Sequence, residues 1–434
     1  MIIQLLLNVN TQKQERRRFQ KTSSSSSENK GDKMRFTQSV RNLNKLLDMK
    51  SLKKLDNYSS FKPSPLTIQN FIDFGRNETA EQKSFTFLRQ EIPVRLSNIM
   101  KEINLLPGNL LCMPSVVILQ DWYSQSFRDL MEFDELKELD DQTLFKFCQT
   151  LKTIQTRHTN VVQTMAQGVL ELKYSHQVDN QTDTAIQYFL DRFYMNRINL
   201  RMLIHQHILL FEPDADQMTK RIGMIDPSCK VKSVIHEAFT DAAILCEDYY
   251  DRAPEISIKG QTLIKNAVGK KVPLSLCYPP PHLYHILLEL FKNSMRATVE
   301  KHSNSKGSGD VPEIEVLVAK GEHDVSIRIS DQGGGIPRHI TNHMFQYLFS
   351  SASRPSMSPT KAPLAGYGYG LPLSRLYAQY FHGDLILNSC DGYAVVYLKT
   401  LANGHDRKDT TFSSGENVSD ELEGKISEYS NVNR

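Results

Sequence analysis

Cysteine and long apolar runs are scarce in this chain of 434 residues, and each scarcity excludes a class of protein. Because the six cysteines are far apart and form no CxxC pair or His/Cys cluster, neither a zinc site nor a disulfide framework is indicated. Isolated cysteines of this kind are typical of reduced, buried thiols. No apolar run approaches the roughly 20 residues needed to cross a bilayer, so we expect no transmembrane segment.

An excess of charge of one sign is also missing. The formal net charge is +3, which is too close to zero to favour nucleic acid or a charged membrane surface as a partner. Hydrophobic residues make up 40% of the chain and charged residues 23%, values typical of globular proteins. The length suits two ordinary domains, so we expect a two-domain globular protein that does not bind nucleic acid.

The two ends of the chain have the composition of disordered segments. Residues 1–57 begin with MIIQLLL, which is too short for a secretory signal and lacks a leading positive charge. The basic, serine-containing, acid-poor stretch that follows fits a mitochondrial presequence, although a plain disordered tail explains it equally well. Translation could start at Met1 or at Met34. Residues 402–434 are polar and partly acidic, and we expect a disordered tail there.

Between these ends the pattern of apolar residues changes from helical to mixed. Residues 58–228 have apolar residues at helical spacing with turn-forming residues between segments, which predicts an antiparallel helical bundle. Residues 229–401 combine strand and helix patterns, which predicts a two-layer α/β sandwich. The predicted fold class is therefore α+β. Helices are predicted at 66–74, 79–102, 116–133, 141–170, 182–211 and 231–249, and strands at 255–259, 272–277, 313–319, 324–330, 384–390 and 393–399.

The most informative stretch is the predicted helix at 282–300, HLYHILLELFKNSMRATVE. Its apolar residues recur three and four apart and define a face that we expect to pack on a core. A carboxylate on the other face can accept a proton from a nucleophile, and an amide oxygen is a ligand suited to Mg²⁺. Alone, this spacing is more typical of a solvated helix face with salt bridges. The polar face holds His285, Glu289, Lys292, Asn293 and Arg296.

Two glycine-rich motifs follow downstream and change this interpretation. Asp331 ends an alternating strand pattern, and the glycines after it, Gly333 and Gly335 among them, let the backbone turn and approach a ligand. The second motif, GYGYGL at 366–371, opens a predicted helix, where free backbone N–H groups and the helix dipole favour a phosphate chain. The stretch between the motifs, 338–365, is rich in Ser, Pro and Thr and predicts a mobile lid.

The order of these motifs resembles the ATP site of the superfamily that includes gyrase, the Hsp90 chaperones, histidine kinases and MutL. Within that superfamily, the fuller resemblance is to the mitochondrial pyruvate dehydrogenase kinases, over about residues 58–401. It is carried by PSPLTIQNFIDFG, FLRQEIPVRLSNIMKEINLLP, RHTNVVQTMAQGV, ELFKNSMRATVE and LAGYGYGLPLSRLYA. The related branched-chain ketoacid dehydrogenase kinases share the ATP motifs but resemble the helical half less well.

The resemblance implies a protein serine kinase of the mitochondrial matrix that uses ATP and Mg²⁺, and it allows K⁺ as a further cofactor. Asn293 would hold Mg²⁺, Asp331 would accept a hydrogen bond from the adenine amino group, and Glu289 would orient or deprotonate the serine hydroxyl. His285 could hydrogen-bond Glu289 and tune its basicity. Lys292 and Arg296 would balance phosphate charge, although a structural ion pair fits them nearly as well. The other candidates for ATP binding are Gly333, Gly335, Ser350, Ser351, Gly366, Tyr367, Gly368, Tyr369, Gly370 and Leu371.

The resemblance also implies partners and an effector. The substrate would be the E1 α subunit of pyruvate dehydrogenase, whose phosphorylation switches off the complex and so regulates pyruvate oxidation. The bundle would dock on the lipoyl domain of the E2 acetyltransferase core. The protein would be a homodimer, although its tail lacks the tryptophan-bearing motif usual in the family. Gln155 replaces a usual arginine of the effector pocket, which removes one carboxylate-binding charge. That pocket, for small carboxylates such as pyruvate, would include Leu96, Tyr123, Ser126, His158, Arg197 and Arg201.

Other activities stay open at this point. A histidine kinase would need an exposed phosphoacceptor histidine, and only His158 has a suitable position. An ATP-driven clamp of the chaperone type would hydrolyse ATP without making a phosphoprotein. A catalytically inactive docking module would keep the bundle and lose the ATP residues, whereas every expected residue type is present here.

Overall fold

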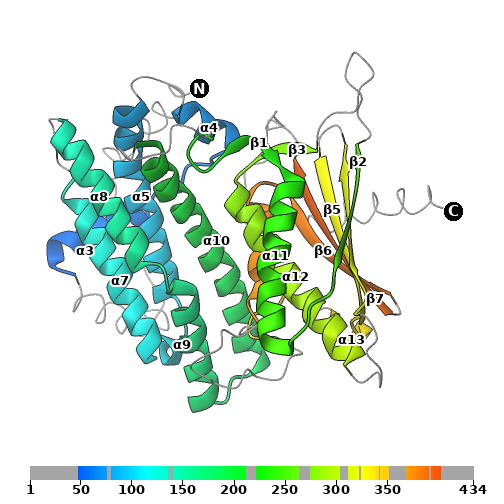
Figure 1. Ribbon diagram of the computed structural model, residues 1–434. Coiled ribbons are helices and arrows are strands. Elements are labelled where there is room, and N and C mark those ends of the chain that lie inside the picture. The colour runs from blue at the N-terminus through cyan, green and yellow to red at the C-terminus, as the bar shows by residue number, and fades with distance from the viewer. Residues whose placement is uncertain are drawn as a thin grey trace, which may run out of the picture.

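The computed structural model contains a bundle of long helices beside a sheet that is covered by helices on one face (Figure 1). The covering helices lie between the sheet and the bundle. The two predicted parts of the chain are thus two layers of one molecule. The residues that the structure describes are 47–75, 80–134, 136, 140–211, 221–262, 274–303, 311–321, 324–341, 343–350, 368–390 and 392–401.

Polar side chains cap the first turns of three bundle helices, α3, α4 and α8. Asp140 accepts a hydrogen bond from the N–H of Thr143 at the start of α8, and Thr67 and Asn70 cap α4 reciprocally. Such caps bind the N–H groups that have no partner within the helix. The helices are α3 (Met49–Ser59), α4 (Ile68–Phe74), α5 (Ala80–Asn104), α6 (Gly108–Leu111), α7 (Pro114–Met131), α8 (Asp141–Arg157), α9 (Val161–Ser175) and α10 (Asn180–Phe211).

Two parts of the bundle differ from the prediction. The chain forms α3 inside the segment expected to be a leader, because Leu55 and Tyr58 are buried where α3 contacts α5. The predicted helix at 141–170 is two helices, and His158 lies at the end of α8 instead of in mid-helix. The His158 ring is buried and hydrogen-bonded to Ser126, so tertiary contacts interrupt a helix that the apolar pattern alone would continue.

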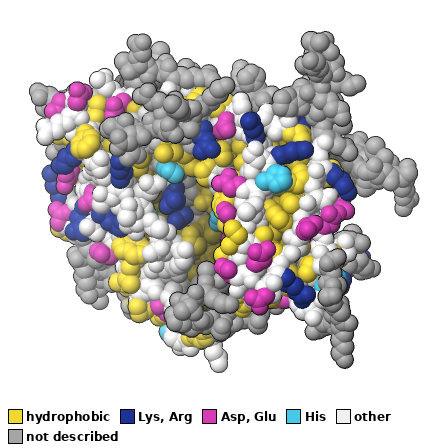
Figure 2. Space-filling model, in the orientation of Figure 1, with side chains coloured by type: hydrophobic (Ala, Val, Ile, Leu, Met, Phe, Trp, Pro, Cys, Tyr) yellow, Lys and Arg dark blue, Asp and Glu magenta, His cyan; other side chains and the backbone are white. Residues whose placement is uncertain are grey.

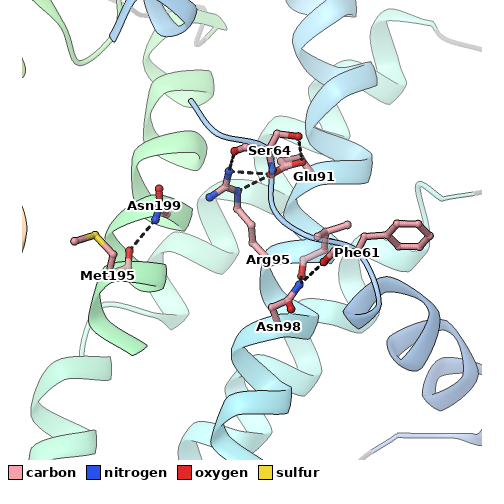
Figure 3. A network of polar contacts seen from close by, with 8 residues as sticks. Phe61, Ser64, Glu91, Arg95, Asn98, Met195 and Asn199 are labelled. Carbon is pink, nitrogen blue, oxygen red and sulfur yellow. Dashed lines mark hydrogen bonds and ion pairs between the residues drawn. The ribbon is translucent and has the colours of Figure 1, made fainter. Parts of the chain in front are cut away.

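A buried ion pair fastens the segment before α4 to α5. Glu91 and Arg95, one turn apart on α5, are both buried and 2.9 Å apart. Glu91 also accepts hydrogen bonds from the N–H and Oγ of Ser64, and Arg95 donates to the Ser64 carbonyl at 2.7 Å. Beside the pair, Asn98 donates to the carbonyl of Phe61 (Figure 3). Both charges therefore have partners, without which a buried ion pair would be strongly destabilising.

The second part of the chain is the predicted two-layer α/β sandwich. Its sheet has the strand order β2-β4-β5-β7-β6 and is antiparallel except for the parallel pair β2–β4. Buried and less buried side chains alternate along β4 and β5, as in strands covered on one face. Helix α12 contacts β5 on this face, and α14 contacts β6. The elements are β1 (Asp226–Lys230), α11 (Val231–Tyr250), β2 (Ile256–Thr262), β3 (Ser275–Tyr278), α12 (Pro280–His302), β4 (Ile314–Lys320), β5 (Asp324–Gly334), α13 (Arg338–Thr341), α14 (Gly370–Tyr380), β6 (Asp384–Cys390) and β7 (Gly392–Leu401).

Helix α10 joins the two halves, because it contacts α5 and α8 in the bundle and α14 in the sandwich. The short strand β1 pairs with β3, and the sequence does not predict it because DPSCK contains proline and lacks apolar alternation. On the face shown in Figure 2, acidic, basic and apolar side chains are interspersed, in keeping with a net charge near zero. None of the helices in the described ranges is long and apolar enough to cross a membrane.

Candidate active site

Helix α12 carries the polar face that the sequence predicts to be catalytic. Prolines occupy its first positions, where a missing N–H costs no helical hydrogen bond. Leu287 and Phe291, on the apolar face, are buried, and the helix contacts both α11 and β5. Packing therefore fixes α12 on the sheet. His285, Glu289, Lys292, Asn293 and Arg296 follow at spacings of three and four along the same helix.

The Glu289 carboxylate lies between its own helix and the start of α14. Lys292 Nζ donates to Glu289 Oε1 at 2.6 Å, and both side chains are mostly buried. The other oxygen lies against Gly370, where an added Cβ atom would be 2.5 Å from it. The first turn of α14 has no side-chain cap. Its N–H groups are therefore available to a carboxylate or a phosphate, which this end of a helix favours.

His285 lies near Glu289, but the predicted hydrogen bond between them is not among the hydrogen bonds of the described residues. Within those residues His285 Nε2 is buried without a partner, and the ring centroid is 5.0 Å from that of Tyr377. Burial lowers the pKa of His285, which the charge of Glu289 opposes. The imidazole is therefore neutral at pH 7, and Lys292 is the group that bonds the carboxylate.

Asn293 and Arg296 continue the polar face. Asn293 is partly buried, and among the described residues Arg296 Nε is buried without an acceptor. No group of three His, Cys, Asp or Glu side chains among these residues could hold a metal ion. A Mg²⁺ ion would therefore use the Asn293 oxygen together with oxygens of a bound phosphate and water, as this ion commonly does.

The end of β5 brings Asp331 to α12. The carboxyl group is buried, and its Oδ1 accepts a hydrogen bond from the N–H of Gly333 at 2.9 Å. Burial raises the pKa of Asp331, while this hydrogen bond opposes the rise. Gly333 packs against α12, because an added Cβ atom would be 2.5 Å from the Cβ of Ala297. A glycine is thus required at 333 so that strand β5 can pack closely on helix α12. The sequence predicts only that it lets the backbone approach a ligand.

The glycine-rich loop is described from Gly368 onward. Gly368 has φ of 77° and faces the backbone of Phe349, so a side chain would be excluded both by conformation and by space. Tyr369 precedes α14, and Gly370 and Leu371 form its first turn. Ser350 is exposed and lies within the predicted lid, 338–365. The predicted residues Ser351, Gly366 and Tyr367 lie outside the described residues.

A second polar cluster lies inside the bundle. Tyr123, Ser126, His158 and Arg197 are buried together, with Leu96 buried nearby on α5 and Arg201 one turn after Arg197 on α10. Ser126 Oγ lies 3.0 Å from His158 Nε2 and accepts a hydrogen bond from Arg157 at 2.8 Å. Among the described residues Tyr123 Oη and Arg197 Nε are buried without partners. Unpaired buried donors of this kind suit an anionic ligand.

Electrostatics favour an anion in this cluster. Burial, followed by the charge of Arg197, lowers the pKa of Arg201. Burial also lowers the pKa of His158 to about 3, so this ring is neutral at pH 7. Arg197 and Arg201 repel each other, and a small anion between their guanidinium groups would offset that repulsion. Arg157 belongs to the cluster as well, because it bridges Ser126 and, at 2.9 Å, Asp129.

The carboxylate helix, the aspartate at the end of a strand and the glycine loop that opens a helix define an ATP-binding domain. Residues 279–412 match the family described as histidine kinase-, DNA gyrase B-, and HSP90-like ATPase, and residues 65–226 match the family described as mitochondrial branched-chain alpha-ketoacid dehydrogenase kinase. The class is therefore that of protein kinases built on this ATPase fold, which confirms the predicted α+β architecture.

Curated relatives specify the family. A human mitochondrial pyruvate dehydrogenase (acetyl-transferring) kinase, isozyme 3, is 51% identical over 81% of this chain and 86% of its own length. A Drosophila melanogaster mitochondrial pyruvate dehydrogenase (acetyl-transferring) kinase is 49% identical over 81% of this chain and 85% of its own length. A Caenorhabditis elegans protein named as a probable kinase of this kind is 48% identical over 80% and 86%. The chain belongs to the mitochondrial pyruvate dehydrogenase kinases. It is a mitochondrial protein serine kinase, and the branched-chain and histidine kinase alternatives are disfavoured.

Proposed function

We propose that this protein transfers the γ-phosphate of ATP to a serine of the pyruvate dehydrogenase E1 α subunit and thereby inactivates the complex. The observation that carries the proposal is the position of Glu289. Its carboxylate lies at the uncapped start of α14, on the same helix face as Asn293. A proton acceptor, a hard metal ligand and a phosphate-binding helix terminus therefore come from two touching helices. Phosphoryl transfer needs mainly this positioning and charge neutralisation.

In this proposal each predicted residue has a defined part. Asp331 accepts a hydrogen bond from the adenine amino group, in addition to those from the Gly333 N–H and the Ser294 side chain. Asn293 would hold Mg²⁺, which would neutralise phosphate charge. Arg296 offers a further positive charge through its unpaired Nε. The helix terminus at Gly370 binds phosphate through backbone N–H groups. K⁺, which the resemblance allows, stays a prediction.

Glu289 acts as the base or as the residue that orients the serine hydroxyl. Lys292 restrains the carboxylate through the 2.6 Å hydrogen bond and keeps one oxygen in place. The neutral His285 ring fills the space next to it and, together with Tyr377, excludes water from that side. His285 is thus a positioning residue for Glu289 in this scheme. General-base assistance of this kind is typically worth a factor of about 10² to 10⁴ in rate.

For the bundle we propose binding of a small carboxylate such as pyruvate as an effector. The cationic cluster of Arg197 and Arg201 would pair with the carboxylate, and Tyr123 Oη would donate a further hydrogen bond. Gln155 is half-buried at this position and contributes no charge. The lipoyl domain of E2 as docking partner and the homodimer are parts of the same proposal, taken from the family.

The test is transfer of labelled γ-phosphate from Mg·ATP to purified pyruvate dehydrogenase, with and without the lipoyl-bearing core. We expect serine labelling that the core stimulates and that Glu289→Gln lowers by a factor of about 10² to 10⁴. The exposed Glu237→Gln on α11 is the matched control and should label like wild type. Label on a histidine of the enzyme, or ATP hydrolysis without labelled protein, would overturn the proposal. ATP binding with neither product would leave a docking module.

A further inference from the structure

Tyr347 belongs to no ATP motif, yet it is buried between the bundle and the glycine-rich loop. Only 2% of the residue is exposed. Its hydroxyl donates to Asp191 Oδ1 at 2.8 Å, and its backbone N–H donates to Gln187 Oε1 at 2.8 Å. Gln187 Nε2 donates in return to the Tyr347 carbonyl at 3.3 Å. Both partners lie on α10, so this helix holds the residue by its side chain and by both of its backbone polar groups.

The Tyr347 ring touches the loop that opens α14. Its centroid is 5.3 Å from that of Tyr369 and 5.4 Å from that of Tyr194, which lies on α10. Tyr194 and Tyr369 are themselves in edge contact at 5.8 Å. Aromatic pairs at such distances stabilise a contact beyond the area that they bury. The three rings form one cluster that joins α10, the segment at 343–350 and the residue preceding α14.

The backbone after Tyr347 runs directly against the glycine loop. Leu348 donates its N–H to the Gly368 carbonyl at 3.2 Å and has φ of 65°. An added Cβ on Gly368 would be 2.5 Å from the Phe349 carbonyl oxygen, so the two backbone segments are in close contact. Two residues later, Gly370 contacts Glu289. A displacement of Tyr347 would therefore move the loop, the start of α14 and the groups that face Glu289.

The hydrogen bond to Asp191 is of the strong, charge-assisted kind. Burial, and then the charge of Asp191, raises the pKa of Tyr347, so the hydroxyl stays protonated and donates. Asp191 is exposed on α10, so the hydrogen bond runs from a buried hydroxyl to a carboxylate at the surface and is itself partly buried. A hydrogen bond between a buried donor and a carboxylate costs more to break than one between neutral groups.

We propose that Tyr347 is a positioning residue for ATP, which fixes the glycine loop against Gln187 and Asp191 of the bundle helix α10. This inference rests on the proposed function, since it assigns the loop to the ATP phosphates. It makes α10 a structural part of the ATP site, although no residue of that helix belongs to an ATP motif. A bundle separated from the sandwich would leave the loop without this support.

The test compares Tyr347→Phe with Tyr250→Phe. Tyr250 Oη donates to Glu300 at 2.7 Å. This is also a hydrogen bond from a tyrosine to a carboxylate in the sandwich, but it joins α11 to α12. For Tyr347→Phe we expect KM for ATP and Kd for ADP to rise about 10-fold, while kcat at saturating ATP changes less than about 2-fold. Tyr250→Phe should leave all three values unchanged. The thermal midpoints of both variants identify any general loss of stability.

Two further variants make the result specific. Asp191→Asn keeps an oxygen that can accept from the tyrosine hydroxyl and should bind ADP nearly as wild type, whereas Asp191→Leu should bind as weakly as Tyr347→Phe. The double variant Tyr347→Phe with Asp191→Leu should be no worse than either single variant, because both remove the same hydrogen bond. Unchanged ADP affinity in Tyr347→Phe, or a fall in kcat with constant KM, would overturn the inference. Wild-type protein that binds no ATP would instead overturn the proposed function.

Discussion

Glu91 in the bundle and Glu289 in the sandwich are each paired with a cation on their own helix, yet their surroundings differ. Glu91 is bonded by Arg95 and twice by Ser64 (Figure 3), so both of its oxygens have protein partners. Glu289 is bonded by Lys292 through one oxygen, and the other lies at the uncapped start of α14. A buried charge with a full set of partners holds a fold together. A charge with an open side can bind or move a proton.

The same difference separates other groups of the two regions. His207 in the bundle is bonded through Nδ1 to Ser84 at 2.8 Å, whereas His285 Nε2 is buried without a partner among the described residues. In the bundle, the cluster at Tyr123 and Arg197 likewise contains buried groups without a partner among the described residues. Incomplete hydrogen bonding of buried groups is thus a feature of both candidate ligand sites, but it also occurs elsewhere in the described residues, as at Arg328 Nε and Tyr380 Oη.

The largest expected effect on stability comes from removing one charge of the structural pair. Glu91→Gln leaves the Arg95 guanidinium buried without a counter-charge and should lower the free energy of unfolding by about 3–5 kcal/mol. Glu289→Gln should lower it by less than Glu91→Gln does, because the side chains of Lys292 and Glu289 are 15% and 20% exposed, whereas those of Arg95 and Glu91 are 6% and 2% exposed. Urea unfolding of both variants measures the difference. Equal losses would contradict the comparison.

Lowering the pH below 6.5 should have a smaller effect on the free energy of unfolding. Burial lowers the pKa of His158 in the bundle and of His282 in the sandwich to about 3, from an ordinary value of 6.5. Above pH 6.5 both rings are neutral in the folded and the unfolded chain. Below it only the unfolded chain binds protons, so each ring lowers the free energy of unfolding by about 2 kcal/mol at pH 5.

Unfolding at pH 7 and pH 5 measures this loss. The variant His282→Phe should lose about 2 kcal/mol less than wild type between the two pH values, since it cannot bind the proton. Its ring contacts those of Tyr377 and Phe381 in tilted pairs, so phenylalanine can fill the same space. A pH dependence that runs parallel to that of wild type would show that His282 does not titrate in this way.

Two glycines of the ATP motifs should respond differently to a methyl group. At Gly333 the added Cβ would meet the Cβ and backbone of Ala297, which cannot move without shifting α12, so Gly333→Ala should cost about 1–3 kcal/mol of stability. At Gly370 it would meet only the end of the Glu289 side chain. Gly370→Ala should therefore lower phosphate transfer while leaving the melting temperature nearly unchanged. Similar melting temperatures for both variants would refute the distinction.

The smallest effect is expected on the bundle surface. Lys146 and Glu132 form an ion pair at 3.0 Å, with more than half of each side chain exposed. Lys146→Ala should change the free energy of unfolding by less than about 1 kcal/mol, and added salt should weaken what effect remains. Comparing the free energies of unfolding of Lys146→Ala and Glu91→Gln shows how much less an exposed ion pair contributes than a buried one. A loss comparable to that of Glu91→Gln would mean that exposure is a poor guide here.

Much of the fold follows from local pattern. Apolar spacing predicts α10, α12 and most other long helices within a few residues, and alternation predicts β4 and β5. Prediction failed where tertiary contacts override that pattern. The break at His158 depends on a ring buried against α7, and α3 depends on Tyr58 reaching the bundle core. The strand β1 depends on its partner β3, since its own sequence does not favour an extended conformation.

Local sequence specifies which residue types can perform the chemistry, because Glu289, Asn293, Asp331 and the glycines stand at spacings that helices, strand ends and turns impose locally. Which of these residues meet depends on the packing of the folded molecule. This packing brings Gly370 against Glu289 and lets Lys292, instead of His285, donate a hydrogen bond to that carboxylate. It also holds Tyr347 against the bundle helix α10 through a hydrogen bond to Asp191. The reason is physical: such contacts join segments far apart in the chain, and packing and the pairing of buried polar groups select them in the folded molecule.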